Sequence, residues 1–167
     1  MKRASFDYHG VTPWIIAKGA AELLHFMKQA FRAKEKPGSR VTNDDGTIAE
    51  VEVEIGNSVL MVCDAKPDWP PTPCFLRLNV RDGDATFDRA LDAGAARVTK
   101  MTDLPSGDRV GRVRDPWGNV WWIDQHIEDV SEDEMAVRAG EPAAIKAKRY
   151  VDDTLDGVLA VGVPYHR

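Results

Sequence analysis

One order of predicted elements occurs twice in this chain, and this repetition constrains its fold more than any other feature. Each copy has a strand, a helix with apolar residues at three- and four-residue spacing, and strands that alternate apolar and polar residues. The first copy contains strands at 11–16, 48–55 and 58–64 and a helix at 19–32; the second contains strands at 75–80, 96–101, 110–114 and 119–124 and a helix at 82–93. The repetition predicts an α+β fold of tandem strand-helix-strand-strand-strand modules.

The turn Asp115-Pro116-Trp117-Gly118 ends the second copy and joins its last two strands. Proline at the second turn position presets φ, aspartate at the first can bond back to the backbone, and glycine at the last tolerates the closing dihedral. The four residues therefore predict a tight hairpin between strands 110–114 and 119–124.

The remaining segments divide the chain into modules at 1–66 and 75–130, a linker at 67–74 and an extension at 131–167. The linker is rich in proline, which cannot continue a strand ladder or a helix. In the extension, Ser131 followed by Glu134 is typical of a helix start, and a second helix is expected over 143–155. The segment 36–46 is predicted to be a loop, and the tail 157–167 is apolar enough to dock on the protein.

The 167-residue composition is ordinary for a globular protein, with 43% hydrophobic residues and a net charge of -5 from interspersed acids and bases. This charge argues against a nucleic-acid partner, and no apolar run reaches the roughly 18 residues of a membrane helix. The N-terminus lacks the apolar stretch of a secretory signal, so a cytoplasmic location is expected. Cys63 and Cys74 are expected to be reduced there.

The sequence around the hairpin resembles the glyoxalase/bleomycin resistance proteins of the vicinal oxygen chelate superfamily, and most closely their phosphonate-operon-like branch. The resemblance rests on the run 107–121 with its Asp-Pro-x-Gly-Asn turn, on 125–131, and on segments 11–31 and 53–61. It covers about residues 8–131. It implies two modules whose mixed sheets curl around a shared cavity, commonly completed in a homodimer.

The resemblance also implies where a metal would be bound, because metal-dependent members use four inward-facing strand positions. These positions correspond to Thr12, Glu52, Arg77 and Trp122 in this chain. A divalent cation needs several oxygen or nitrogen donors, whereas a guanidinium repels it and an indole offers no lone pair. We therefore expect no metal cofactor at these positions.

Displaced metal ligands are the alternative, because other potential ligands lie on the same strands. Glu50 shares a strand face with Glu52, and Asp124 and His126 share one with Trp122. Such a site would restore the lyase, isomerase or dioxygenase chemistry of the superfamily. His126 otherwise reads as a surface or capping residue at the end of its strand.

The expected ligand-binding residues are Thr12, Trp14, Glu52, Arg77, Trp122 and Asp124. Trp14 and Trp122 would offer flat faces to a planar or cationic ligand, or would simply fill the cavity. Glu52 and Arg77 would form a clamp for an oxyanion, or a salt bridge in place of the metal.

Three further side chains have simpler expected roles. Trp121 has the opposite strand parity to Trp122 and is expected to pack under a helix. Arg109 is a candidate for an anion patch. Arg112 and Arg114 share a strand face and are expected to face acidic residues of the next strand, with Glu50, Glu52 and Glu54 as one candidate set.

Together these features predict a homodimeric protein that binds a small organic molecule in a metal-free cavity, in a sequestration or resistance role. A metal-dependent enzyme of the same superfamily is the rival hypothesis. A third is a protein-interaction module whose C-terminal extension mediates assembly.

Overall fold

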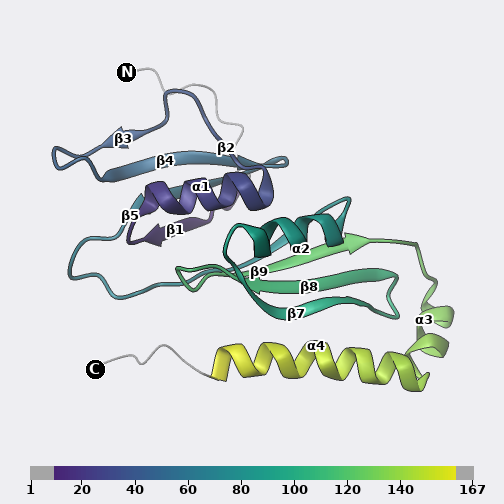
Figure 1. Cartoon of the computed structure of the whole chain (residues 1–167). Helices are drawn as coiled ribbons and strands as arrows, with labels where there is room; N and C mark the ends of the chain where they lie inside the picture. The colour runs from purple at the N-terminus through teal and green to yellow at the C-terminus, as the bar shows by residue number, and fades with distance from the viewer. Residues whose placement is uncertain (1–9, 161–167) are drawn as a thin grey trace. The chain divides into compact units, whose positions relative to one another are not determined.

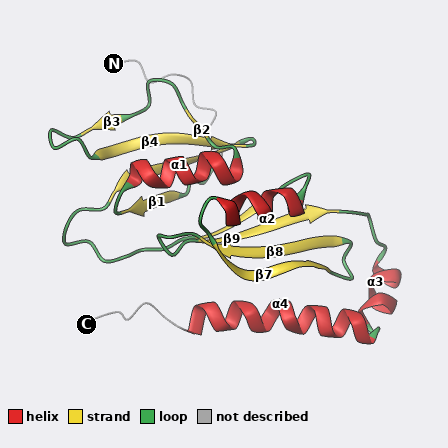
Figure 2. Cartoon of the chain, viewed as in Figure 1, coloured by secondary structure: helices red, strands yellow, loops and turns green. Residues whose placement is uncertain are grey.

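The computed structural model describes residues 10–160, which fall into two compact units that are considered separately. The first unit ends at Pro73 and the second begins at Cys74, within the proline-rich segment. Within residues 10–160, no helix is both long and apolar enough to cross a membrane. Figure 1 follows the chain through both units, and Figure 2 shows their helices and strands.

The first unit is a mixed sheet covered by one helix. Its elements are β1 (Trp14–Ala17), α1 (Ala20–Phe31), β2 (Lys34–Glu35), β3 (Val41–Thr42), β4 (Ile48–Ile55) and β5 (Ser58–Asp64). The strand order is β1-β5-β4-β2, with β3 also paired to β4. β1 runs parallel to β5, and the other pairs are antiparallel.

The alternation of β4 separates a core face from a polar face. Val51 lies beside Val62, which lies beside Ile15, and all three are buried on the face that α1 covers. Helix α1 contributes Leu23 and Met27 to the same core. Because strand side chains alternate, the glutamates of β4 lie on the opposite face.

Asp64, at the end of β5, holds the N-terminus of α1. Its carboxylate accepts hydrogen bonds from the backbone N–H groups of Gly19 (3.1 Å), Ala20 (2.8 Å) and Ile48 (2.7 Å). The N-cap residue Gly19 has no side chain for this task. The carboxylate thus satisfies donors that a helix start otherwise leaves open.

We expect Asp64→Ala to lower the free energy of unfolding by about 2 kcal/mol, because three backbone donors lose their acceptor. Asp64→Asn keeps one carbonyl oxygen, so it should lose less than the alanine variant. Urea unfolding followed by circular dichroism measures both. Equal losses in the two variants would contradict the capping role.

The second unit repeats the module and adds two helices. It contains β6 (Phe75–Asn79), α2 (Gly83–Asp92), β7 (Ala96–Asp103), β8 (Asp108–Arg114), β9 (Val120–His126), α3 (Glu132–Ala139) and α4 (Pro142–Ala160). The strand order is β6-β9-β8-β7, with β6 parallel to β9 and the other pairs antiparallel. This order matches that of the first unit, so the predicted α+β duplication with a helical C-terminal extension is confirmed.

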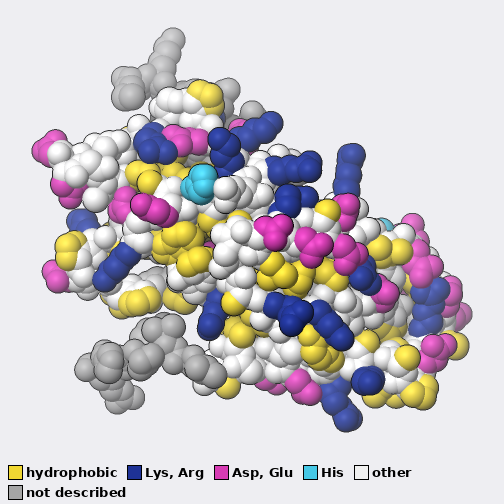
Figure 3. Space-filling view, in the orientation of Figure 1, with side chains coloured by type: hydrophobic (Ala, Val, Ile, Leu, Met, Phe, Trp, Pro, Cys, Tyr) yellow, Lys and Arg dark blue, Asp and Glu magenta, His cyan; other side chains and the backbone are white. Residues whose placement is uncertain are grey.

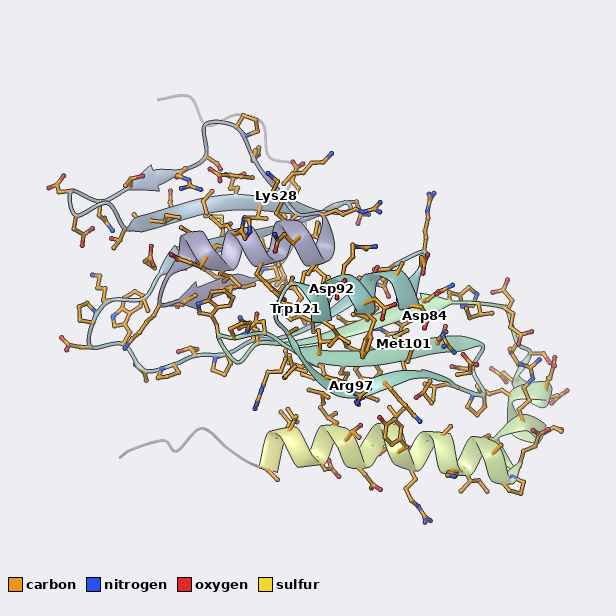
Figure 4. All side chains as sticks on the ribbon, viewed as in Figure 1. Lys28, Asp84, Asp92, Arg97, Met101 and Trp121 are labelled. Carbon is orange, nitrogen blue, oxygen red and sulfur yellow. The ribbon has the colours of Figure 1, made fainter. Side chains whose placement is uncertain are left out.

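Helices α2 and α4 lie on opposite faces of the second sheet (Figures 1 and 2). A Cβ at Gly111 of β8 would meet Phe87 of α2 and Met101, whereas the next residue, Arg112, bonds to Val151 of α4. Consecutive strand residues point to opposite faces, so each helix covers one of them. Trp121 and Met101, labelled in Figure 4, belong to the α2 side.

Several expectations differ from the structure. The segment 36–46 is not only a loop, because β3 pairs with β4 there. Gly157 to Ala160 continue α4 instead of beginning a docked tail, while residues 161–167 lie outside the described part of the chain. Arg112 has Thr99 and Trp122 as its strand neighbours, so the predicted ladder of arginines and glutamates is wrong for it.

Candidate functional site

Two arginines flank Trp122 on the sheet face that is opposite α2. Trp122 of β9 lies beside Arg77 of β6 and beside Arg112 of β8, so the three side chains form a row across three strands. The guanidinium carbon is 4.1 Å from the ring centroid for Arg112 and 5.5 Å for Arg77. Phe75 adds an edge-on contact, with ring centroids 6.2 Å apart.

A carboxylate of β9 pairs with the arginine at the β6 end of this row. Arg77 Nη2 donates to Asp124 Oδ2, and the Asp124 side chain is 5% exposed while that of Arg77 is 54% exposed. Burial raises the pKa of Asp124, although Arg77 opposes that rise. The structure thus brings together the predicted residues Arg77, Trp122 and Asp124, with an accessible cation at their edge.

Arg112 is buried at the other end of the row. Its side chain donates from Nη1 to Thr99 Oγ1 (3.2 Å) and to the backbone carbonyl of Val151 (2.6 Å). The residue is only 2% exposed, and burial lowers the pKa of its guanidinium. Sequence reasoning missed this role, because Arg112 appeared to be one member of a surface charge ladder.

Helix α4 makes two further polar contacts with β7. Tyr150 Oη accepts a hydrogen bond from the Lys100 backbone N–H (3.0 Å), and the Thr154 and Thr99 hydroxyls are 2.7 Å apart. Val151 is the buried residue of the helix. The C-terminal extension therefore covers the β7 and β8 part of the face that carries Trp122.

His126 lies at the exposed end of the same face. Its ring nitrogens are 3.0 Å from Asp108 Oδ1 and 3.0 Å from Asp129 Oδ1, and its side chain is 58% exposed. The expected surface position of His126 is confirmed. Hydrogen bonds to Asp108 and then to Asp129 raise the pKa of His126, and the bond to His126 lowers that of Asp108.

We expect His126 to titrate above its ordinary pKa of 6.5. A raised folded-state pKa means that the stabilisation is complete below the unfolded-state pKa and is lost as pH rises through the folded-state value. NMR titration should show the high pKa, and Asp108→Asn should lower it. Between pH 6 and 9, the free energy of unfolding should fall less in His126→Gln than in the wild-type protein. The same pH dependence in both proteins would contradict this.

Of the predicted residues of the first unit, Trp14 and Glu52 lie on the sheet face opposite α1, and Thr12 precedes the first strand. Trp14 lies beside Met61, which lies beside Glu52, and Trp14 is 52% exposed. Glu52 pairs with Lys36 Nζ at 2.8 Å. Thr12 precedes β1, so its expected place inside a strand is wrong.

Glu52 and Arg77 each have a charged partner within their own unit. Lys36 pairs with Glu52, and Asp124 pairs with Arg77. Each unit thus offers an alternative to the predicted Glu52–Arg77 pair, which stays a prediction.

The residues at the metal positions of the superfamily do not fit a divalent cation. Arg77 is itself a cation, and the Trp122 indole nitrogen carries a hydrogen instead of a free lone pair. Glu52 is the one ionisable acid of the four and is paired with Lys36. Within each unit of residues 10–160, no three His, Cys, Asp or Glu side chains form a group suited to a metal, and a displaced site with Glu50, Asp124 or His126 stays an alternative.

Two other predicted side chains are bonded to carboxylates of the protein itself. Trp121 is fully buried on the α2 face, as expected, and its Nε1 donates to Asp115 Oδ2 at 2.9 Å. Arg109 bonds to Asp84 (2.9 and 3.1 Å) and Asp103 (2.7 Å), so carboxylates of the protein already occupy this candidate anion site. More widely, Figure 3 shows acidic and basic side chains intermixed on the visible surface.

Comparison with known proteins identifies the family. Residues 13–123 match the Glyoxalase/Bleomycin resistance protein/Dioxygenase superfamily. An uncharacterised protein of Mycobacterium bovis is 35% identical over an alignment of 136 residues, which covers 75% of this chain and 88% of the relative. The chain therefore belongs to this superfamily, and the fold implied by its hairpin motif is confirmed.

Solved structures agree on the fold. TioX from Micromonospora matches with a TM-score of 0.57 and 20% identity, covering 74% of this chain and 100% of TioX. The fosfomycin resistance protein FosX from Listeria monocytogenes matches with a TM-score of 0.56 and 11% identity, covering 78% of this chain and 99% of FosX. The phosphonate-operon-like branch stays a prediction.

Proposed function

We propose that this protein binds a small organic molecule on the sheet face formed by Arg77, Trp122 and Asp124, without a metal ion. The observation that carries the proposal is the row of two guanidinium groups around one indole ring, in which Arg77 and Trp122 hold two of the positions that the resemblance assigned to metal ligands. An aromatic face with a few polar groups suits the capture of a planar ligand. It supplies no Lewis acid for the metal-dependent chemistry.

A sequestration or resistance role follows from this binding mode. Structural neighbours include proteins named for fosfomycin resistance, which agrees with such a role. We also propose that the protein acts as a cytoplasmic homodimer, in keeping with the assembly expected for the superfamily. Size-exclusion chromatography with light scattering measures that assembly.

We expect a thermal-shift and calorimetry screen of small aromatic compounds to find ligands whose binding depends on Trp122. Trp122→Leu should weaken binding about tenfold or more, because the flat ring face is lost. Trp69→Leu is the matched control, since Trp69 is an exposed tryptophan of the linker segment. Equal binding by wild type and Trp122→Leu would contradict the proposed site.

Metal analysis tests the other half of the proposal. The protein is purified, incubated with nickel, zinc, manganese or iron, and desalted before metal is measured. We expect no stoichiometric metal. Stoichiometric metal that Glu52→Gln removes would overturn the metal-free mode and favour a superfamily enzyme.

A further inference from the structure

Two buried hydrogen-bond donors lie in adjoining groups and have no acceptor among the described residues. They are Arg112 Nε and Trp122 Nε1, for which the described residues 10–160 supply no partner. The two groups are stacked, with the Arg112 guanidinium carbon 4.1 Å from the Trp122 ring centroid. Buried polar groups are normally hydrogen-bonded, so this pair calls for an explanation. Both atoms are donors, and the missing partner is therefore an acceptor.

Arg112 also differs from other arginines of the chain in its charge balance. Arg77 pairs with Asp124, and Arg109 pairs with Asp84 and Asp103. Arg112 is more deeply buried than either, yet its bonded acceptors are a threonine hydroxyl and a backbone carbonyl. Asp152 of α4 acts on it electrostatically, but no carboxylate of residues 10–160 forms an ion pair with it. A buried charge is usually paired. The missing acceptor is therefore expected to be negatively charged.

We propose that Arg112 and Trp122 form a binding site for an oxyanion of the ligand, a carboxylate or phosphonate, and that helix α4 covers this site. The inference rests on the proposed ligand-binding function and narrows the ligand to an anionic compound, in place of the cationic one that Trp122 alone suggested. A guanidinium binds an oxyanion through parallel N–H groups, and the indole N–H adds one donor.

Helix α4 occupies part of this site in the covered state. The Val151 carbonyl accepts from Arg112 Nη1 at 2.6 Å, on the same guanidinium whose Nε is an open donor. A neutral carbonyl is a weaker acceptor for a guanidinium than an anion is. Arg112 Nε and Trp122 Nε1 are buried, so a ligand reaches these donors only when α4 moves away from β8.

The contacts of α4 suit such a movement. Of its 19 residues, Val151 is the one that is buried. Its polar contacts with β7 are the bond from Lys100 to Tyr150 and the pair of hydroxyls on Thr99 and Thr154. Elements with few buried apolar contacts open at the lowest free-energy cost.

A reversible disulfide across these hydroxyls tests the movement in the full-length protein. The Thr99 and Thr154 Oγ1 atoms are 2.7 Å apart, so Thr99→Cys combined with Thr154→Cys places two thiols within bonding reach. We expect calorimetry to show benzoate and phenylphosphonate binding that falls about tenfold or more on oxidation, because α4 can no longer leave Arg112. Reduction should restore it. The two single-cysteine variants are the controls, and unchanged binding by the oxidised double variant would overturn the covering role of α4.

The charge of the ligand is tested by comparing benzoate with benzamide, which has the same ring and no charge. Wild type should bind benzoate about tenfold or more tightly than benzamide, as expected for charge-assisted hydrogen bonds. Arg112→Met should remove this preference, and Arg112→Lys should keep part of it. If the methionine variant does not fold, the comparison of benzoate with benzamide in wild type still tests the charge of the ligand. The disulfide variant still tests the covering role of α4.

The outcomes separate the two proposals. Equal binding of acid and amide by wild type, with both lost in Trp122→Leu, would overturn the oxyanion site and leave the proposed function standing. Failure of every aromatic probe to bind would instead overturn the proposed function. Tight benzoate binding that responds to oxidation would support both.

Discussion

Replacing Asp115 by alanine is expected to cause the largest loss of stability among single substitutions in the hairpin, about 3 kcal/mol or more. The buried carboxylate accepts four hydrogen bonds: from the backbone N–H of Trp117 (3.0 Å) and of Asn119 (2.9 Å), from Asn119 Nδ2 (2.8 Å) and from Trp121 Nε1 (2.9 Å). Alanine leaves these donors without their acceptor, and both Asn119 and Trp121 are buried.

The loss should extend beyond the turn. The Asn119 side-chain oxygen accepts from the Cys74 backbone N–H at 2.9 Å, next to the start of β6. An Asn119 side chain released by Asp115→Ala would no longer hold that strand. Hydrogen exchange should therefore speed up in β6 as well as in the hairpin.

Asp45→Ala is the matched control for this prediction. Asp45 also accepts bonds within a short turn, from the Thr47 N–H (3.0 Å) and hydroxyl (2.6 Å), but it is exposed to solvent. Water can replace those bonds, so urea unfolding should show a much smaller loss. Similar losses in both variants would contradict the importance that we assign to the buried network.

Gly107→Ala should lower the free energy of unfolding by about 2–3 kcal/mol. Gly107 has φ of +86°, which is unfavourable for other residues, and an added Cβ would lie too close to the Glu128 carbonyl oxygen, a backbone atom that cannot swing aside. The Gly107 carbonyl also accepts from the Ile127 N–H at 2.9 Å. The substitution therefore separates the loop before β8 from the segment after β9.

Gly46→Ala isolates the backbone contribution to this effect. Gly46 has nearly the same φ, +85°, but nothing lies within 4 Å of an added Cβ. We expect a loss of about 1 kcal/mol from the strained φ alone. Urea unfolding gives the loss of unfolding free energy in each variant, and the larger loss in Gly107→Ala measures the cost of the clash with Glu128. Equal losses would show that the structure relieves the clash without cost.

Much of the fold follows from patterns that act over a few residues. The alternation in 48–55 predicts β4, and the Gly56-Asn57 turn after it predicts β5 at 58–64, both with their observed bounds. The Ser131 signal predicts the start of α3, where Ser131 Oγ accepts from the Glu134 N–H at 3.3 Å. The sequence patterns do not predict the short strands β2 and β3, because a two-residue strand carries no periodic signal.

The candidate site was predictable only in part. Strand parity places Trp122 and Asp124 on one face, and the family resemblance assigns Arg77 to the same site, where it lies beside Trp122. Parity also places Arg112 on that face, but it says nothing about which element covers an arginine. The expectation of a surface charge ladder was wrong because α4 buries Arg112.

The sequence by itself thus determined the duplicated modules, the hairpin and the side chains that share a strand face, since these depend on dihedral preferences and on periods of two and 3.6 residues. Only the tertiary structure decided the environment of those side chains. The contact between Arg112 and Val151 joins residues 39 positions apart, and the Thr99–Thr154 contact spans 55. No local pattern encodes such pairings, because they arise from the packing of α4 against the sheet.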